Sequence, residues 1–519
     1  MPLPGAECFF PLHPIMNWSV IPMSFFSTRG GACATASQAI LQGLADDGGL
    51  YVPAMFPPLT MKKIAELGSM TYQQRAVSIL KLYLEDFSLQ ELNQAIAQAY
   101  DPAKFDDARI APVRRLDEQT HVLELFHGPT RAFKDMALQL LPHLTTLAAR
   151  KNGEQREVSI LVATSGDTGK AALEGFRDVP GTSCTVFYPT DGVSDVQKLQ
   201  MTTTQGSNTH VIALNGNFDD AQTGVKQLFA SHDFAAQMNA RGRVLSSANS
   251  INFGRLAPQI VYYFSAYADL LHAGAIQPGD PVNFVVPTGN FGNILAAYYA
   301  RQMGLPVGKL ICASNRNNVL TDFFSTGVYN ARRVFHKTTS PSMDILISSN
   351  LERLLFELAD RDGETVAQWM QQLKADGTYR VDEQQLRWLQ GLFAAGYADD
   401  AQCAEEIRTC FRQQGYLMDT HTAVASRVLR DYRAATGDQT VTVIVSTASP
   451  YKFAGDVLSA LVEEDAATLG DAFACCDRLS QLSDLPVPAQ VTALRTLPIR
   501  HTARCDKDGM ADSVLRCFD

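Results

Sequence analysis

The sequence predicts an α/β protein whose parallel-type sheets are covered by helices on both faces. From residue 122 onward, short strands rich in Val, Ile and Leu alternate with helices. These strands are apolar along almost their whole length, which is typical of strands buried on both faces of a parallel sheet. Glycine-containing turns follow two of the strands and begin helices. Because ligands bind at the carboxyl ends of such strands, we expect the functional site there.

Length and composition indicate a folded protein that acts on small molecules. The 519 residues, 46% of them hydrophobic, can bury a large core. The formal net charge of -10 and the scattered Lys and Arg residues argue against nucleic-acid binding. The sequence contains no apolar stretch near the roughly 20 residues that span a bilayer, so no membrane contact is expected. Ten cysteines without a CxxC pair indicate reduced thiols, and we expect a soluble, cytoplasmic protein.

The first part of the chain divides into two regions. Residues 1–22 contain five prolines and neither Lys nor Arg, which predicts a disordered extension and not a secretory signal. Residues 23–115 carry apolar side chains at helical spacing in 36–42, 71–84 and 89–99. We therefore expect a mainly helical N-terminal domain at 23–115.

The remaining residues, 116–519, are predicted to form the catalytic region. It is expected to include a smaller, mobile subdomain at about 150–265. At about 344–436 the chain is rich in Gln, Arg, Asp and Glu, which predicts a helical surface insertion with little strand. The predicted strands are 122–126, 158–163, 185–188, 210–214, 282–287, 310–313 and 441–445.

Two strand-to-helix junctions have the features of phosphate-binding turns. The turn at 165–169 (SGDTG) follows one apolar strand, and the turn at 289–293 (GNFGN) follows another. Such a turn directs backbone N–H groups at an anion, and the following helix adds the positive end of its dipole. Each turn is also compatible with an ordinary strand-to-helix connection. Together they predict two anion sites of phosphate size.

A lysine lies at a third junction of the same kind. Strand 122–126 is followed by a Gly-Pro turn and then by Lys134, between Phe133 and Asp135. A solvated lysine paired with a neighbouring aspartate is the plainer interpretation. Burial beside aromatic rings would instead lower the pKa of the amine and allow it to attack an aldehyde. A nucleophilic lysine near two anion sites predicts a phosphorylated carbonyl cofactor.

Two more polar segments follow predicted strands or precede helices. Residues 446–450 close the last strong strand, where a hydroxyl either caps a helix or contacts a ring nitrogen. Residues 246–255 are dense in amides and hydroxyls, which suits either a capped turn or a pocket for a carboxylate or phosphate. The sequence has neither an HExxH pair nor a GxSxG elbow, so no metal site and no Ser-His-Asp hydrolase is expected.

The sequences of these motifs and their order along the chain resemble those of the threonine synthase family, in its longer bacterial and fungal form. The resemblance implies a fold-type II pyridoxal-phosphate enzyme with two open parallel-type sheets, similar in its core to tryptophan synthase β. It also implies conversion of O-phospho-L-homoserine and water into L-threonine and phosphate. A monomer or homodimer is expected. The segments that carry the resemblance are 27–30, 43–53, 125–139, 163–169, 250–252, 287–293 and 447–453.

The resemblance also implies the roles of individual residues. Lys134 matches the lysine that links covalently to the cofactor, and Thr447 matches the hydroxyl expected at the pyridine nitrogen. The loop for the cofactor phosphate is matched by Gly289, Asn290, Phe291, Gly292 and Asn293. The expected substrate-binding residues are Ser165, Gly166, Asp167, Thr168, Asn249, Ser250, Asn252 and Arg255.

Four places depart from the family pattern. They are Arg131, Lys170, Ser449 and the segment 253–255. None of them is a matched cofactor residue, so the departures concern the substrate more than the cofactor. A related phospho-lyase or serine/threonine dehydratase on the same fold therefore stays open, as does a non-catalytic paralogue.

Overall fold

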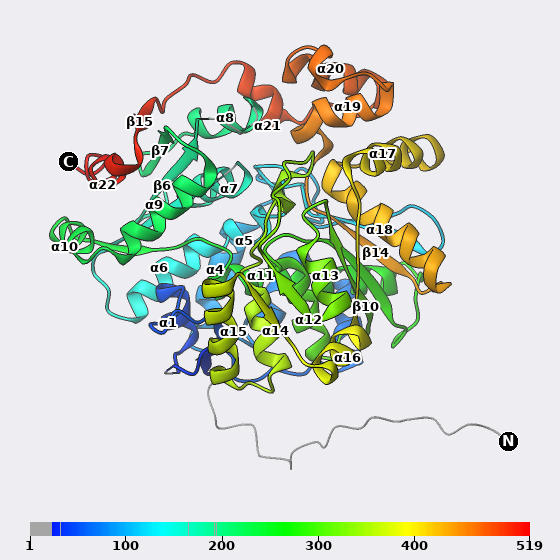
Figure 1. Cartoon of the computed structure of the whole chain (residues 1–519), viewed down its shortest axis with the longest axis horizontal. Coiled ribbons are helices and arrows are strands. Elements are labelled where there is room, and N and C mark those ends of the chain that lie inside the picture. The colour runs from blue at the N-terminus through cyan, green and yellow to red at the C-terminus, as the bar shows by residue number, and fades with distance from the viewer. Residues whose placement is uncertain (1–22, 32, 165, 191–192, 194) are drawn as a thin grey trace.

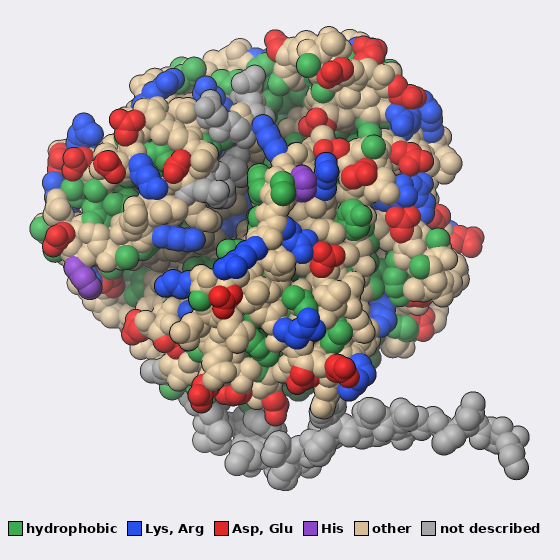
Figure 2. Space-filling model, in the orientation of Figure 1, with side chains coloured by type: hydrophobic (Ala, Val, Ile, Leu, Met, Phe, Trp, Pro, Cys, Tyr) green, Lys and Arg blue, Asp and Glu red, His purple; other side chains and the backbone are tan. Residues whose placement is uncertain are grey.

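The computed structural model describes residues 23–31, 33–164, 166–190, 193 and 195–519. Within these residues, two sheets lie beside one another and helices surround both (Figure 1). On the face drawn in Figure 2, basic and acidic side chains are interspersed. None of the described helices combines the length and apolar character needed to cross a bilayer. The predicted extension at 1–22 and the predicted site residue Ser165 lie outside the described residues.

The larger sheet has six strands in the order β13-β10-β9-β14-β4-β3. Edge strand β3 runs antiparallel to β4, and the other neighbours run parallel. Since β9, β14 and β4 point the same way, the loops that follow them emerge at one edge of the sheet. Their bounds are β3 (Val113–Arg115), β4 (Thr120–Glu124), β9 (Val282–Pro287), β10 (Val307–Ser314), β13 (Phe393–Tyr397) and β14 (Thr442–Ser446).

The smaller sheet has five parallel strands in the order β15-β7-β6-β5-β8. Most of its strands come from the middle of the chain, but the edge strand β15 comes from near the carboxyl terminus. Two parallel-type sheets flanked by helices are the predicted fold class. The bounds are β5 (Glu157–Ala163), β6 (Thr182–Pro189), β7 (Thr209–Leu214), β8 (Arg243–Ser246) and β15 (Ala503–Cys505).

The N-terminal region is mainly helical and carries a short antiparallel ribbon of β1 (Phe25–Ser27) and β2 (Tyr51–Pro53). Helix α3 ends at Leu80, before the predicted end at 84, because the chain changes to tighter turns in which the Tyr83 N–H donates to the Leu80 carbonyl at 3.0 Å. The helices are α1 (Ala36–Gln42), α2 (Met61–Glu66), α3 (Tyr72–Leu80) and α4 (Leu89–Ala99).

The helices of the rest of the chain surround the two sheets (Figure 1). Helix α11 (Phe253–His272) is buried along almost its whole length, because its apolar residues occupy all sides of the helix. The others outside the predicted insertion are α5 (Asp135–Leu138), α6 (Leu141–Lys151), α7 (Asp167–Phe176), α8 (Asp195–Thr202), α9 (Phe218–Ala230), α10 (His232–Ala240), α12 (Gly292–Gln302), α13 (Val319–Thr326), α19 (Ala454–Val462), α20 (Ala472–Ser483), α21 (Ala489–Thr492) and α22 (Met510–Leu515).

The region at 344–436 is mostly helical, yet it is not only a surface insertion. Its strand β13 pairs with β10 in the larger sheet, and β12 (Thr378–Arg380) pairs with β11 (Val328–Asn330). The region is therefore part of the sheet architecture. Its helices are α14 (Leu351–Leu358), α15 (Gly363–Asp376), α16 (Glu383–Leu392), α17 (Asp400–Gln414) and α18 (Thr420–Thr436).

Candidate functional site

A pocket lies at the carboxyl ends of β4, β9 and β14, where the fold was predicted to bind its ligand. Residues from distant parts of the sequence meet there, including most of those proposed for the cofactor and the substrate. Its lining comprises Phe133, Lys134, Thr168, Asn249, Ser250, Arg255, Gln259, Pro287, Thr288, Gly289, Asn290, Phe291, Gly292, Asn293, Ser342, Met343, His421 and Thr447.

Lys134 is buried at the N-terminal end of α5. Its Nζ lies 3.3 Å from Asp167 Oδ2 and 3.1 Å from Ser342 Oγ. Burial lowers the pKa of this amine; Asp167 opposes the shift, and the charges of Lys452 and Arg255 lower the pKa further. Burial and the two neighbouring cations therefore make this amine easier to deprotonate than a lysine in water.

The turn that carries Lys134 is fixed by local hydrogen bonds. The backbone N–H and the hydroxyl of Thr130 both donate to the Asp135 carboxylate at 2.8 Å. The Phe133 N–H donates to the carbonyl of Thr447 at 2.8 Å, which joins the turn to the end of β14. These contacts place Lys134 and Thr447 in the same pocket.

The loop at 289–293 is shaped by one close approach and one strained residue. A Cβ atom on Gly289 would lie 2.7 Å from the Ser342 carbonyl oxygen, so only glycine fits there. Phe291 adopts the left-handed conformation (φ 64°), and its buried ring stacks on Phe324 with centroids 6.0 Å apart. The left-handed residue of this loop is thus a phenylalanine that the core holds in place.

Asn293 gives a direct test of whether a phosphate fits this loop. The Tyr263 hydroxyl donates to Asn293 Oδ1 at 2.7 Å, and the Tyr262 hydroxyl lies 2.5 Å from the same oxygen. The Nδ2 atom is buried and has no partner among the described residues. An unpaired buried donor next to the N-terminus of α12 requires an acceptor, and a phosphate oxygen supplies one. The residues present therefore fit the expected cofactor phosphate.

A second cation lines the pocket. The Arg255 side chain is 5% exposed and donates from Nη1 to the Ala248 carbonyl at 2.9 Å. It forms no ion pair within the described part of the chain. Burial lowers its pKa to about 10, so the guanidinium stays charged at neutral pH. Together with Asn249 and Ser250, it offers a place for a substrate anion.

Two of the predicted substrate-binding residues, Asn252 and Gly166, form hydrogen bonds within the fold. Asn252 caps α11: its amide nitrogen donates to the Ile40 carbonyl at 2.9 Å, and its oxygen accepts the Gly254 N–H at 2.8 Å. Both ends of the Asn252 amide are thus bound within the fold, and its substrate role stays a prediction. The Gly166 N–H is likewise bound, to the Thr164 hydroxyl at 3.0 Å.

The residues that depart from the family pattern make contacts of their own. Arg131 forms an ion pair with Asp106. Lys170 pairs with Glu174 at 3.0 Å. The Ser449 hydroxyl accepts the Tyr451 N–H at 3.4 Å. These three side chains have structural partners outside the pocket lining, whereas Arg255, within the fourth departure at 253–255, lines the pocket.

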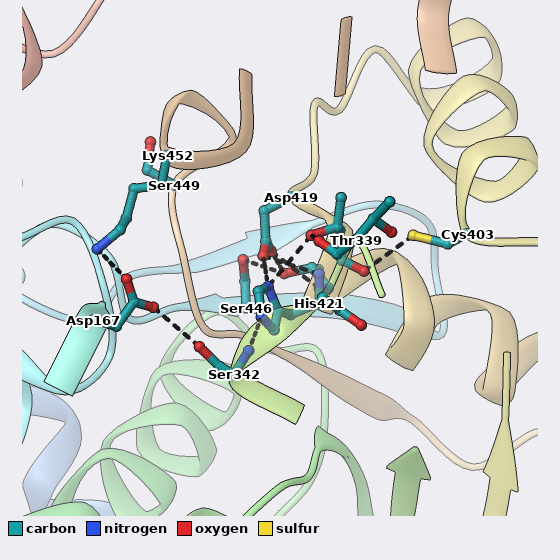
Figure 3. Close-up of polar contacts among 12 residues, drawn as sticks. Asp167, Thr339, Ser342, Cys403, Asp419, His421, Ser446, Ser449 and Lys452 are labelled. Carbon is teal, nitrogen blue, oxygen red and sulfur yellow. Dashed lines mark hydrogen bonds and ion pairs between the residues drawn. The ribbon is translucent and has the colours of Figure 1, made fainter. Parts of the chain in front are cut away.

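The structure also brings in residues that the sequence motifs did not indicate. The Ser342 N–H donates to His421 Nε2 at 3.2 Å, and His421 Nδ1 lies 2.8 Å from Asp419 Oδ2 (Figure 3). His421 therefore carries its proton on Nδ1. This chain of contacts fixes Ser342 beside Lys134. The only local signal in the sequence for this group is the run Asp-Thr-His at the start of α18, which was not used in the prediction.

Replacing Gly289 with alanine is expected to weaken cofactor binding at least tenfold. The added methyl group would meet the Ser342 carbonyl and displace the loop, at about 1–3 kcal/mol for overpacking. Gly391→Ala is the matched control, because a Cβ at that helical position meets no atom within 4 Å. Titrating the protein with pyridoxal phosphate and following its absorbance gives both affinities. Equal affinities for the two variants would contradict the assignment of the loop.

Sequence profiles of three families match the chain. The Threonine synthase N terminus profile covers residues 24–100. The profile of the Pyridoxal-phosphate dependent enzyme family covers residues 109–447, and that of Threonine synthase, C-terminal covers residues 422–500. The three matches span nearly all of the described fold, from the N-terminal helices to the region after β14.

Individual proteins agree with the profiles. The chain is 43% identical to the threonine synthase of Pseudomonas aeruginosa, over 83% of this chain and 89% of that one. It is 44% identical to threonine synthase-like 1 of Macaca fascicularis over 82% of this chain, but it spans only 58% of that protein's length. The crystal structure of pyridoxal-phosphate-bound threonine synthase from Brucella melitensis superposes with a TM-score of 0.85 at 36% identity, covering 95% of this chain and 99% of that one. These findings confirm the predicted fold-type II class and the resemblance.

Proposed function

Because the chain belongs to the threonine synthase family of pyridoxal-phosphate-dependent enzymes, we propose that it converts O-phospho-L-homoserine and water into L-threonine and phosphate. One observation carries the proposal for this chain. A single pocket is lined by Lys134, the loop at 289–293 and Arg255, a cation without an ion pair among the described residues. A substrate with both an amine and a phosphate needs an amine-reactive centre and a second anion site, and the pocket has residues for both.

The loop at 289–293 and Lys134 are the proposed cofactor residues. The unpaired amide of Asn293 and the first turn of α12 bind the cofactor phosphate. Lys134 holds the cofactor covalently, and Thr447 presents its hydroxyl to the pyridine nitrogen. Bound pyridoxal phosphate supplies an aldehyde for covalent attachment and a ring that withdraws electrons from the substrate.

In the proposed reaction Lys134 moves the protons. As a neutral amine it removes the protons from Cα and Cβ of the substrate, and it returns protons as the product forms. The Cγ–O bond breaks and phosphate leaves, while water supplies the hydroxyl group at Cβ. Arg255, Asn249 and Ser250 hold the departing phosphate. Thr168, at the start of α7, closes the pocket from the side of the smaller sheet.

Product analysis tests the proposal. The cofactor-loaded protein is incubated with O-phospho-L-homoserine, and the amino-acid and oxo-acid products are separated. We expect L-threonine and phosphate in equal amounts. 2-Oxobutyrate without threonine would identify a phospho-lyase or dehydratase on this fold, and the absence of any conversion would identify a non-catalytic paralogue.

Three further expectations accompany the proposed function. We propose that the protein works in the cytoplasm and as a monomer or homodimer. We also propose that 150–265, which contains most of the smaller sheet, moves as a unit during the reaction. Sedimentation of the purified protein distinguishes a monomer from a homodimer.

A further inference from the structure

Lys452 lies deep in the protein behind the pocket. It belongs to the single turn Pro450–Phe453 that follows β14, and its side chain is fully buried. Its Nζ lies 2.6 Å from Asp167 Oδ1 (Figure 3). The same Nζ donates to the Thr130 carbonyl at 3.0 Å. A buried ammonium group is costly to keep charged, and these two contacts offset that cost. No step of the proposed reaction uses this lysine.

Asp167 joins the two buried lysines. Its Oδ1 accepts from Lys452 and from Gln197 Nε2 at 2.9 Å, and its Oδ2 faces Lys134 at 3.3 Å and the Ser342 hydroxyl at 3.1 Å. Burial alone would raise the pKa of this carboxyl, but Lys452 and then Lys134 hold it well below its usual range. The Asp167 carboxylate thus contacts the amines of both lysines, and its contact with Lys452 is the shorter of the two.

The other charged groups around the pair leave an excess of positive charge. Arg255 on α11 acts on Lys134 as a second cation. The carboxyl of Asp135 on α5 has its pKa raised to about 6 by burial, against hydrogen bonds from Thr130 and the charge of Lys452. Glu174 on α7 acts on Asp135 and is paired with Lys170. His421 reaches the group only through the backbone of Ser342.

We propose that Lys452 is a positioning residue that takes Asp167 as its own ion-pair partner and so lets the Lys134 amine lose its proton. Two cations cannot both be fully compensated by a single buried carboxylate. Lys452 has the shorter contact with the carboxylate and no exposure. Lys134, whose amine faces the pocket, releases its proton and becomes the nucleophile. The inference rests on the proposed role of Lys134 and adds the residue that sets its protonation.

Trace labelling of the full-length protein without added cofactor tests the inference. An amine-reactive reagent is applied across a pH series, and mass spectrometry gives the midpoint at which Lys134 becomes reactive. The exposed Lys62 is the internal reference. We expect the wild-type midpoint of Lys134 to lie below that of Lys62. A midpoint equal to or above that of Lys62 would overturn the proposal without the use of any variant.

Two variants of Lys452 sharpen the test. In Lys452→Met, Asp167 is left to Lys134 alone, so the Lys134 midpoint should rise by about one pH unit or more, a tenfold loss of neutral amine at a given pH. Lys452→Arg keeps the charge and should keep the wild-type midpoint. An unchanged or lower midpoint in a folded Lys452→Met protein would overturn the inference. Because the labelling needs no substrate, its outcome is separate from the product analysis that tests the proposed reaction.

Discussion

Lys134→Ala is expected to lower the rate of threonine formation by at least about a thousandfold while the protein still folds. The amine is the proposed covalent attachment point and the proton carrier, and a positioned acid–base group alone contributes 10²–10⁴-fold. The fold should tolerate the change, since Asp167 keeps its 2.6 Å ion pair with Lys452. The loop at 289–293, proposed to bind the cofactor phosphate, is also untouched, so reversible cofactor binding should persist.

Borohydride reduction followed by mass spectrometry measures this effect apart from activity. Reduced wild-type protein should carry the cofactor on Lys134, and the variant should carry none. Lys170→Ala is the matched control, because that lysine is also buried and paired with an acidic residue but stands outside the pocket lining. An adduct on a different lysine in the wild-type protein would show that the cofactor is attached there and not to Lys134.

Arg255→Met is expected to raise KM for O-phospho-L-homoserine about 100-fold and to leave cofactor affinity nearly unchanged. The loss corresponds to a charge-assisted contact with the substrate anion, about 2–3 kcal/mol. Stability should change little, because the variant removes a buried cation that has no acidic partner among the described residues and only one bond, to the Ala248 carbonyl.

Arg75→Met provides the comparison for Arg255. Arg75 is equally buried but pairs with Asp269 at 2.7 Å and bonds the Ser265 hydroxyl at 2.6 Å, away from the pocket. The Arg75→Met protein should have a lower free energy of unfolding and an unchanged KM. Steady-state kinetics and urea unfolding of both proteins distinguish the two effects. A wild-type KM in Arg255→Met would assign the substrate phosphate to other residues.

The elements that the sequence predicted well are those whose pattern is local. The continuous apolar runs of β5, β9 and β14 are typical of buried strands, and the helical spacing of apolar residues predicted α1 and α4 with the bounds that the structure shows. Strands β13 and β15 were not predicted. β13 is short and contains Ala and Gly, and β15 is exposed for most of its length, so neither has a strand pattern of its own. Their pairing is imposed by the neighbouring strands.

Among the site residues, too, those within local motifs were predicted and those defined by long-range contacts were not. Lys134 and the loop at 289–293 were predicted because each turn carries its own chemistry within a few residues. Lys452 lies within the segment 447–453, but no role was predicted for it, because its partner Asp167 is far away in the sequence and their contact exists only in the folded chain. The capping contact of Asn252 depends on the fold in the same way: its partner, the carbonyl of Ile40, lies 212 residues away.

In the proposed reaction, phosphate leaves by cleavage of the Cγ–O bond and water adds at Cβ. Running the reaction of the cofactor-loaded protein in ¹⁸O-labelled water and weighing both products by mass spectrometry tests it most directly. The account predicts threonine with one ¹⁸O atom in its hydroxyl group and phosphate with none. Labelled phosphate together with unlabelled homoserine would show cleavage of the P–O bond instead, and would contradict the account.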